Sequence, residues 1–233
     1  MLNNLRGWLG AGCFMLVAAG ASVQASEDVV SYDDPWEKVN RATFAFNDTL
    51  DTWVLKPVAK GYDTVTPKPV QGLVTNFFQN LGEIRNVANS LLQFELKEAG
   101  VSTGRFLVNS TVGMLGMVDV GTAVGMDHKY NDFGMTLARW HVPSGPYVVL
   151  PVLGPRTVRS TAGLLPDSAA DPVTYVTPSH DKTWLQVTDT VNFRADLLDK
   201  EGLVVGDKYT FIRDAYLQRR AFLITGEAPR DDF

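Results

Sequence analysis

Residues 34–54 read DPWEKVNRATFAFNDTLDTWV and contain the clearest structural pattern in the chain. Asp34 suits the N-cap of a helix, Pro35 suits its first turn, and Glu37 favours the same end. Apolar side chains then recur at three- and four-residue spacing, at Trp36, Val39, Thr43, Phe46, Leu50 and Trp53. The spacing predicts an amphipathic helix from residue 35 to about residue 54.

The same helical periodicity continues along the chain, with breaks at prolines and glycines. Lys56-Pro57 is expected to stop or kink the first helix, and residues 66–69, TPKP, mark a second break. A second apolar stripe runs from Val70 to Phe78, Gly82 is expected to interrupt it, and a third runs over 84–94. Further helices are predicted over 97–108, 184–191 and 209–223. The predicted fold class is therefore all-α, with no β-rich half and no internal repeat.

A row of asparagines lies on the polar side of the second and third stripes, at Asn76, Asn80, Asn86 and Asn89. A solvated helix face is the ordinary interpretation of such a row. Uncharged hydrogen-bonding groups opposite an apolar stripe also suit a polar path for lipid headgroups. Both interpretations are open at the level of sequence.

Two segments are rich in helix-breaking residues. Gly113, Gly116, Gly121 and Gly125 punctuate an apolar segment, which predicts either a buried glycine-rich turn and helix or close helix packing through the Gly-x-x-x-Gly pair 121–125. Residues 142–155, VPSGPYVVLPVLGP, are almost wholly apolar and contain four prolines. Those prolines exclude a regular helix and fit poorly in a single strand, so we expect a loop that is buried or lies against lipid.

Composition narrows the class of protein. The chain has 233 residues, 45% of them hydrophobic and 20% charged, with a net charge of −5. These values are typical of one folded domain, and they provide no basic field to hold nucleic acid. We therefore predict no nucleic-acid partner.

The N-terminus has the pattern of an export signal over residues 1–25. A short basic start is followed by apolar residues 7–20, and Val23-Gln24-Ala25 suits signal peptidase, which leaves 26–233 as the mature domain. Lipidation at Cys13 is the alternative, but Gly10 stands where lipoproteins usually have an aliphatic residue. The mature part has no uninterrupted apolar stretch of about 20 residues, the length that a spanning helix needs.

The search for catalytic and metal-binding motifs is negative. His128, His141 and His180 are not paired at metal-ligand spacing, and the single cysteine lies in the signal segment. Ser144 lies in Pro-Ser-Gly-Pro, which is not a nucleophile elbow. No phosphate-binding glycine loop is present. We predict no enzyme activity, no cofactor and no metal, and any transport must be passive.

Six segments in order resemble the VacJ/MlaA family of outer-membrane phospholipid-transport proteins. They are DPWEKVNR with FAFN (34–41 and 44–47), NFFQNL (76–81), RFLVNS (105–110), DFG (132–134), GPYVVLP (145–151) and RDAYLQRR (213–220). The resemblance covers essentially the whole mature chain.

The resemblance implies an all-α, ring-shaped single domain around an amphipathic channel, on the periplasmic side of the outer membrane. It implies removal of mislocalised phospholipids from the outer leaflet to maintain lipid asymmetry. A trimeric porin and a soluble periplasmic lipid carrier are the implied partners. Family members are typically lipoproteins, and this chain departs from them around Cys13. A soluble periplasmic lipid-binding carrier is the alternative function.

Nine residues are candidates for lipid binding. They are Phe44, Phe46, Asn47, Phe77, Asn80, Arg105, Gly145, Pro146 and Tyr147. Core packing is the competing interpretation for Phe44 and Phe46, and a structural salt bridge for Arg105. Residues 145–147 are expected to form a rigid turn that lines the channel or a buried loop.

Overall fold

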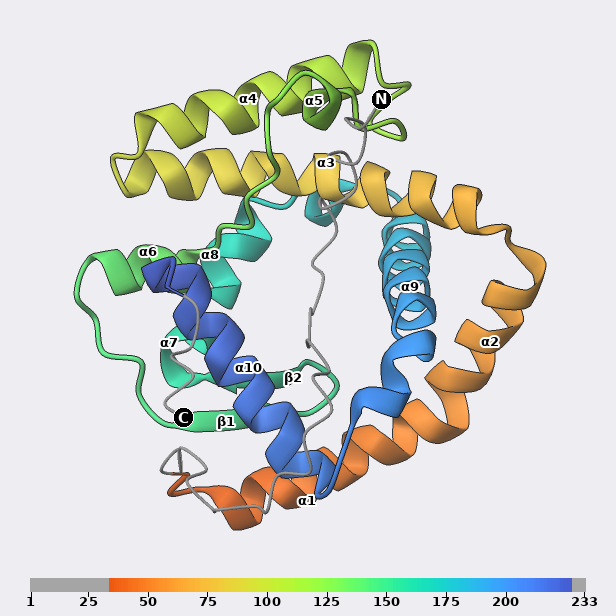
Figure 1. Cartoon of the computed structure of the whole chain (residues 1–233), viewed down its shortest axis with the longest axis vertical. Helices are drawn as coiled ribbons and strands as arrows, with labels where there is room; N and C mark the ends of the chain where they lie inside the picture. Colours follow the sequence, from red (N-terminus) through yellow and green to blue (C-terminus); the bar gives the residue numbers. More distant parts are fainter. Residues whose placement is uncertain (1–33, 228–233) are drawn as a thin grey trace, which may run out of the picture. The chain divides into compact units, whose positions relative to one another are not determined.

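Helices carry most of the chain between residues 34 and 227, the part that the computed structural model describes (Figure 1). The predicted signal segment 1–25, with Cys13, lies outside the described residues. The elements in order are α1 (Glu37–Leu50), the π-helical turn η1 (Asp51–Leu55), α2 (Lys56–Val65), α3 (Lys68–Leu92), α4 (Leu96–Thr111), α5 (Val120–Ala123), α6 (Phe133–Arg139), β1 (Tyr147–Leu150), β2 (Gly154–Thr157), α7 (Val158–Ala162), α8 (Leu164–Ala169), the 3-10 turn η2 (Pro172–Tyr175), α9 (Ser179–Asp196), the 3-10 turn η3 (Leu198–Leu203) and α10 (Lys208–Thr225).

The first helix begins two residues later than its sequence predicts and does not stop at Lys56-Pro57. Asp34 precedes a turn, where its carboxylate accepts the Trp36 N–H at 3.2 Å and its carbonyl accepts the Glu37 N–H. Because Pro57 has no N–H, it cannot continue the α-helical bonding pattern. The wider π-helical turn η1 ends at Leu55, two residues before Pro57, and the chain continues as α2 at an angle to α1 (Figure 1).

The expectation that Gly82 divides two helices was wrong. α3 is one continuous helix of 25 residues. A single glycine costs a helix only about 1 kcal/mol relative to alanine, and α3 packs along its length against α4, α6 and α9. These contacts outweigh the local preference of Gly82.

The proline-rich stretch 142–155 forms most of a β-hairpin, which corrects the expectation of a loop. β1 pairs antiparallel with β2, with Tyr147 opposite Thr157 and Leu150 opposite Gly154. The prolines before and after β1 lie outside it, so they remove no hydrogen-bond donor from that strand. The buried residues Tyr147 and Val149 pack with Tyr209 of α10 in an apolar cluster.

The elements of residues 34–227 form a closed series of contacts. Along this series each element packs on the next, in the order α1, η1, α2, α9, α3, α6, α10, β2, β1 and back to α1 (Figure 1). The predicted fold class, a single all-α domain, is confirmed, with the two-stranded hairpin as an addition.

Candidate functional site

The polarity of the α3–α4 pair is inverted relative to a helix pair in water. The residues that α3 and α4 bury are almost all polar or charged, namely Gln71, Asn80, Glu83, Asn86, Asn89, Ser90, Ser102, Arg105 and Asn109, with Ala99 as the exception. Large apolar side chains such as Leu91, Leu92 and Leu107 are exposed instead. The interpretation of the asparagine row as a solvated face was therefore wrong for Asn80, Asn86 and Asn89. An apolar exterior around a polar interior suits a lipid environment.

A charged network fills the space between α3 and α4. Arg105, which is 2% exposed, donates from Nε to Glu83 at 2.7 Å and from Nη2 to Asp119 at 3.1 Å. Its Nη1 donates to Thr122 at 2.9 Å, and His128 Nδ1 lies 2.7 Å from the same Glu83 oxygen. Every guanidinium nitrogen thus has a protein partner. Arg105 therefore forms a structural salt bridge, and it has no guanidinium nitrogen left for a lipid phosphate.

The same network sets the ionisation of Glu83. Burial by itself raises the pKa of Glu83, but hydrogen bonds from His128 and Asn86 and the nearby positive charges lower that pKa overall. Asp132, on the other side of α3, shows the same balance. Burial raises the pKa of Asp132, but the hydrogen bond and positive charge of Arg220 lower it by more, so the pKa is lowered overall. Both buried carboxylates are held in their charged form.

Asn80 and the neighbouring glycines shape the segment that follows α4. The Asn80 amide donates to Ser110 Oγ at 2.9 Å. Gly116 adopts φ +91° against Asn80, where a Cβ would approach the Asn80 Cβ to 2.6 Å. Gly121 is less crowded, since a Cβ there would meet Arg105 Cγ at 3.0 Å, and Gly125 has open space around it. The close-packing interpretation of the pair 121–125 therefore applies only to Gly121.

Two asparagines of α1 hold the backbone of the β-hairpin. Asn40 donates to the Tyr147 carbonyl at 3.0 Å and accepts the Val149 N–H at 2.9 Å. Asn47 repeats this pattern on the Leu150 carbonyl at 2.9 Å and the Val152 N–H at 2.8 Å. Seven helical residues rise about 10.5 Å, and three extended residues span about 10 Å, so the two asparagines match two successive sites along β1 and the turn that follows it.

The remaining predicted site residues do not converge on one point. Phe44 packs edge-on against Tyr209 with ring centroids 5.6 Å apart, in the cluster that contains Tyr147. Phe46, on the same helix, is 52% exposed. Phe77 lies half-buried against Phe78 on α3.

Gly145 and Pro146 lead directly into β1. Gly145 has φ +65° and lies so close to Val158 that a Cβ would be 2.9 Å from it, and the Pro146 carbonyl accepts the Val158 N–H at 3.1 Å. These two residues fix where the hairpin starts.

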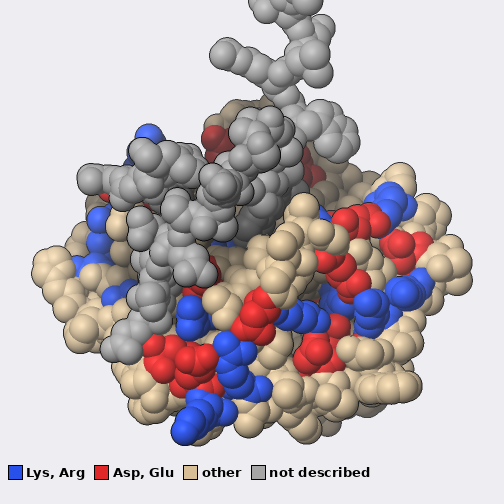
Figure 2. Space-filling view, turned by 60° about the horizontal axis from the view of Figure 1, so that its bottom comes forward, with Lys and Arg blue, Asp and Glu red and all other residues tan. Residues whose placement is uncertain are grey.

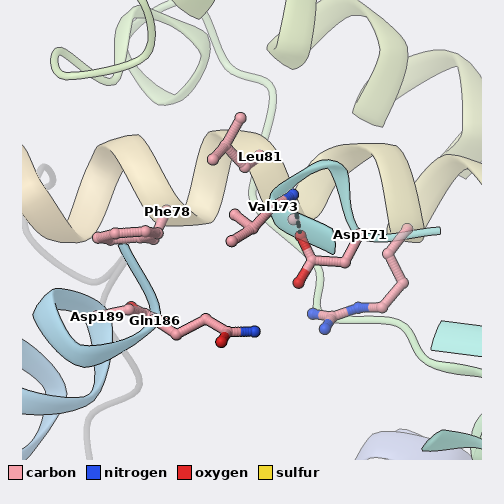
Figure 3. A pocket seen from close by; sticks show the side chains of 8 residues that line it. Phe78, Leu81, Asp171, Val173, Gln186 and Asp189 are labelled. Atoms are coloured by element: carbon pink, nitrogen blue, oxygen red, sulfur yellow. Dashed lines mark hydrogen bonds between the residues drawn. The ribbon is translucent and has the colours of Figure 1, made fainter. Parts of the chain in front are cut away.

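A pocket that the sequence did not predict lies between α3, η2 and α9. Its volume is about 150 Å³, and it is lined by Phe78, Leu81, Gly82, Arg85, Asp171, Val173, Gln186 and Asp189. Figure 3 shows Phe78 and Leu81 on α3, with Val173 beside them and the side chain of Gln186 below. The only signal in the sequence is that Phe78, Leu81, Gly82 and Arg85 share one face of α3, opposite the face that packs on α4.

The charged groups of this pocket differ from those of the buried network. Arg85 lies over the Tyr130 ring at 5.0 Å, and its buried Nε has no hydrogen-bond partner within residues 34–227. Burial raises the pKa of Asp189, the negative charge of Asp171 raises it further, and Arg85 opposes both. No ion pair within the described part of the chain joins Arg85 to either carboxylate. The pocket thus presents one cation and two anions that do not satisfy each other.

The surface divides into charged and apolar regions. On the face in Figure 2, Lys and Arg lie beside Asp and Glu, and the lower edge is largely uncharged. Apolar side chains are exposed along α1, η1 and α2, where Trp53 is 78% exposed, and in the turn after α4 at Met114 and Leu115. Within residues 34–227 no helix combines the length and apolar character needed to cross a membrane.

Comparison with known proteins agrees with this architecture. The family model described as "MlaA lipoprotein" matches residues 32–223. A protein of Escherichia coli K12, "Intermembrane phospholipid transport system lipoprotein MlaA", is 32% identical over 94% of this chain and 88% of its own length. An uncharacterised protein of Rickettsia prowazekii is 34% identical over 80% of this chain and 76% of its own.

The fold is also similar to that of a solved structure. The structure titled "Structural basis for maintenance of bacterial outer membrane lipid asymmetry" aligns with a TM-score of 0.73 and 33% sequence identity, over 83% of this chain and all of the other. Sequence and fold therefore agree over most of the length, and this chain belongs to the MlaA lipoprotein family.

Proposed function

We propose that this chain transports phospholipids between membranes and thereby maintains the lipid asymmetry of the outer membrane. The E. coli and Shigella flexneri relatives are named as lipoproteins of an intermembrane phospholipid transport system, and the similar solved structure concerns outer-membrane lipid asymmetry. The observation that carries the proposal is the inverted polarity of α3 and α4, because apolar side chains outside and polar groups inside suit a protein that lies in lipid.

The physical problem of moving a phospholipid supports a mixed surface. About 30 acyl CH₂ groups at about 0.8 kcal/mol each cost roughly 24 kcal/mol when fully exposed to water. Moving the charged headgroup through hydrocarbon is separately prohibitive. A useful path must therefore offer apolar and polar surfaces side by side. The closed series of helices provides both, with exposed aromatics such as Phe46 and the charged pocket between α3 and α9.

The proposed transport is passive and non-catalytic. The sequence has no phosphate-binding loop through which nucleotide energy enters a protein. Direction then comes from differences in lipid chemical potential and from the affinity of the next carrier. We propose removal of mislocalised phospholipid from the outer leaflet, with a trimeric porin and a soluble periplasmic carrier as partners and the periplasmic side as the location.

Among the predicted lipid-binding residues we assign two kinds of role. Phe46 and Phe77 contact lipid, because they keep exposed or half-exposed rings. Phe44, Asn47, Asn80 and residues 145–147 position the hairpin and the turn after α4 around the path. The test substitutes Phe46→Ser and compares it with Phe44→Ser. We expect the first to slow lipid removal at normal protein level, and the second to lower the protein level itself.

A soluble periplasmic carrier is the second candidate, and the exposed apolar side chains of α1, α2 and α4 argue against it. Fractionation separates the two. We expect the protein with the outer membrane, together with porin and phospholipid. Recovery only in the soluble periplasmic extract, without porin, would favour the carrier.

The decisive experiment measures phospholipid at the cell surface. Deletion of the gene is expected to raise outer-leaflet phospholipid, and expression of the full chain is expected to restore the normal level. Surface phospholipid that stays unchanged on deletion would contradict the proposed function.

The proposal also concerns the position of the mature N-terminus. We propose cleavage after Ala25, and acylation of Cys13 is the alternative, which the description of the family as lipoproteins supports. The intact mass of the purified protein separates the two, because acyl chains add several hundred daltons to a chain that begins at residue 13.

A further inference from the structure

We propose that the pocket between α3, η2 and α9 binds a zwitterionic phospholipid headgroup, with the phosphate on Arg85 and the ammonium between Asp189 and Asp171. This inference rests on the proposed function, and it adds a position and a preference among lipids that the transport role does not supply.

Arg85 has the properties of a phosphate ligand. It is half-buried on the pocket side of α3, and its buried Nε has no partner in the described part of the chain. Tyr130 lies against one face of the guanidinium, 5.0 Å from ring centroid to Cζ, and within residues 34–227 no hydrogen bond uses the Arg85 Nη1 or Nη2 groups. The contrast with Arg105 is direct, since the donors of Arg105 are used by protein acceptors. A planar guanidinium with open donors matches two oxygens of a phosphate.

The two carboxylates decide which phosphate-bearing ligand fits. Asp171 uses one oxygen to accept the Val173 N–H at 2.9 Å, as Figure 3 shows, and Asp189 lies across the pocket on α9. With Arg85 their formal charges sum to −1, so a bare anion is repelled once Arg85 is paired. A ligand that carries a phosphate and an ammonium satisfies both signs. Partial burial of Asp189 raises its pKa, so a cation beside it is favourable.

The shape of the pocket agrees with a headgroup. Its volume of about 150 Å³ is below the roughly 300–1,000 Å³ of sites that enclose drug-sized ligands. Phe78, Leu81 and Val173 supply an apolar border, against which the glycerol and the first acyl carbons can lie while the chains remain outside.

The experiment measures which lipids the full chain retains. Detergent-solubilised protein is incubated with vesicles of equal phosphatidylethanolamine and phosphatidylglycerol, and the bound lipids are quantified by mass spectrometry. We expect the wild type to enrich phosphatidylethanolamine about fivefold. Arg85→Gln is expected to lower bound phosphatidylethanolamine about tenfold, and Asp189→Asn to bring the ratio of the two lipids close to one. Arg85→Lys, which keeps the charge, is expected to restore part of the binding.

Matched variants separate the site from general effects. Arg219→Gln removes the same charge from an exposed position of α10 and is expected to match the wild type. Gly82→Leu blocks the pocket without changing its charge, since a Cβ there meets only Arg85 Nη2 at 3.8 Å, and it is expected to lower binding like Arg85→Gln. If Arg85→Gln fails to fold, Gly82→Leu still tests the pocket.

Three outcomes would overturn the inference. Wild-type levels and ratios of lipid in both Arg85→Gln and Gly82→Leu would exclude the pocket. Competition by inorganic phosphate as strong as that by glycerophosphoethanolamine would indicate a simple anion site. A wild type that binds both lipids equally would exclude the preference, while it would leave the transport role intact. Binding of no phospholipid at all by the wild type would contradict the proposed function itself.

Discussion

Arg105 is the residue on which the stability of the α3–α4 pair most depends. It neutralises Glu83, which is wholly buried, and also pairs with Asp119. A buried pair of this kind contributes little relative to an apolar pair, yet the loss of one partner leaves an uncompensated charge. The effect of a substitution therefore depends strongly on whether the carboxylate that remains can reach water.

We expect Arg105→Ala to lower the free energy of unfolding by about 3–5 kcal/mol, because Glu83 then stays buried without its cation. The control is Arg139→Ala, which breaks an exposed pair with Glu95 and is expected to cost about 0–1 kcal/mol. Chemical denaturation of both variants in the same detergent gives the comparison. Equal costs for the two variants would contradict the assignment of Arg105 to a structural salt bridge.

The β-hairpin depends on α1 in the same local way. Asn40 is 1% exposed and satisfies one carbonyl and one N–H of the hairpin, whereas Asn47 does this at a half-buried position. The helix thus takes the place of a neighbouring strand for the edge of β1.

Asn40→Ala is expected to destabilise the fold by about 2–4 kcal/mol, since a buried donor and a buried acceptor both lose their partner. Asn47→Ala is the matched variant and is expected to cost less, because water can reach its site. Hydrogen exchange at the Val149 amide reports the effect directly, and we expect faster exchange in Asn40→Ala alone. Unchanged exchange would show that Asn40 does not hold the strand.

A second link joins α2 and α9 through charges. Lys56 Nζ lies 2.7 Å from Glu201, and Arg194 pairs with both Glu201 and Asp51. Hydrogen bonds from Lys56 and Arg194 lower the pKa of Glu201 from 4.5 to about 2.

This pKa predicts a pH dependence with a definite sign. A carboxylate whose pKa is lower in the folded state stabilises the fold above its unfolded pKa, and the contribution is lost as the pH falls toward the folded pKa. We expect wild type to be more stable than Glu201→Gln at pH 7, and the difference to shrink between about pH 4.5 and about pH 2. A difference that stays constant over this range would contradict the link. Thermal unfolding of the two proteins across the range provides the measurement.

The molecule as a unit is expected to bind membranes through its exposed apolar side chains. Met114 and Leu115 are exposed in the turn after α4, with φ values of +54° and +61°. We expect the double substitution Met114→Glu and Leu115→Glu to weaken vesicle binding about tenfold or more, because charged groups must then enter the apolar layer. Thr183→Glu on exposed α9 is the control and should float with vesicles like the wild type. Equal flotation of both variants would exclude this turn from the contact.

The sequence predicted the positions of the helices better than it predicted which of their faces are buried. Periodicity located α1, α3, α4, α9 and α10. A periodic pattern gives each helix an apolar and a polar face, but it does not say which face is exposed to water. The sequence therefore left two interpretations of Asn80 and Asn86 open, and the ordinary one, a solvated face, is wrong because both are buried. The sequence did not identify Asn40 as a hydrogen-bond partner of the hairpin backbone, because Tyr147 and Val149 lie more than 100 residues further along the chain. Arg85 was missed because only the fold brings α3 and α9 together.

The polar interior also has a calorimetric consequence. The heat capacity change of unfolding grows with the apolar surface that becomes exposed and falls with polar exposure, and ordinary domains show about 12–15 cal/mol/K per residue. Residues 34–227 bury more polar and charged side chains than apolar ones, and much apolar surface is already uncovered in the folded state. Calorimetry should therefore give a smaller value per residue. The curve of unfolding free energy against temperature should therefore be flatter. Cooling should destabilise this protein less than it destabilises a protein with an apolar core.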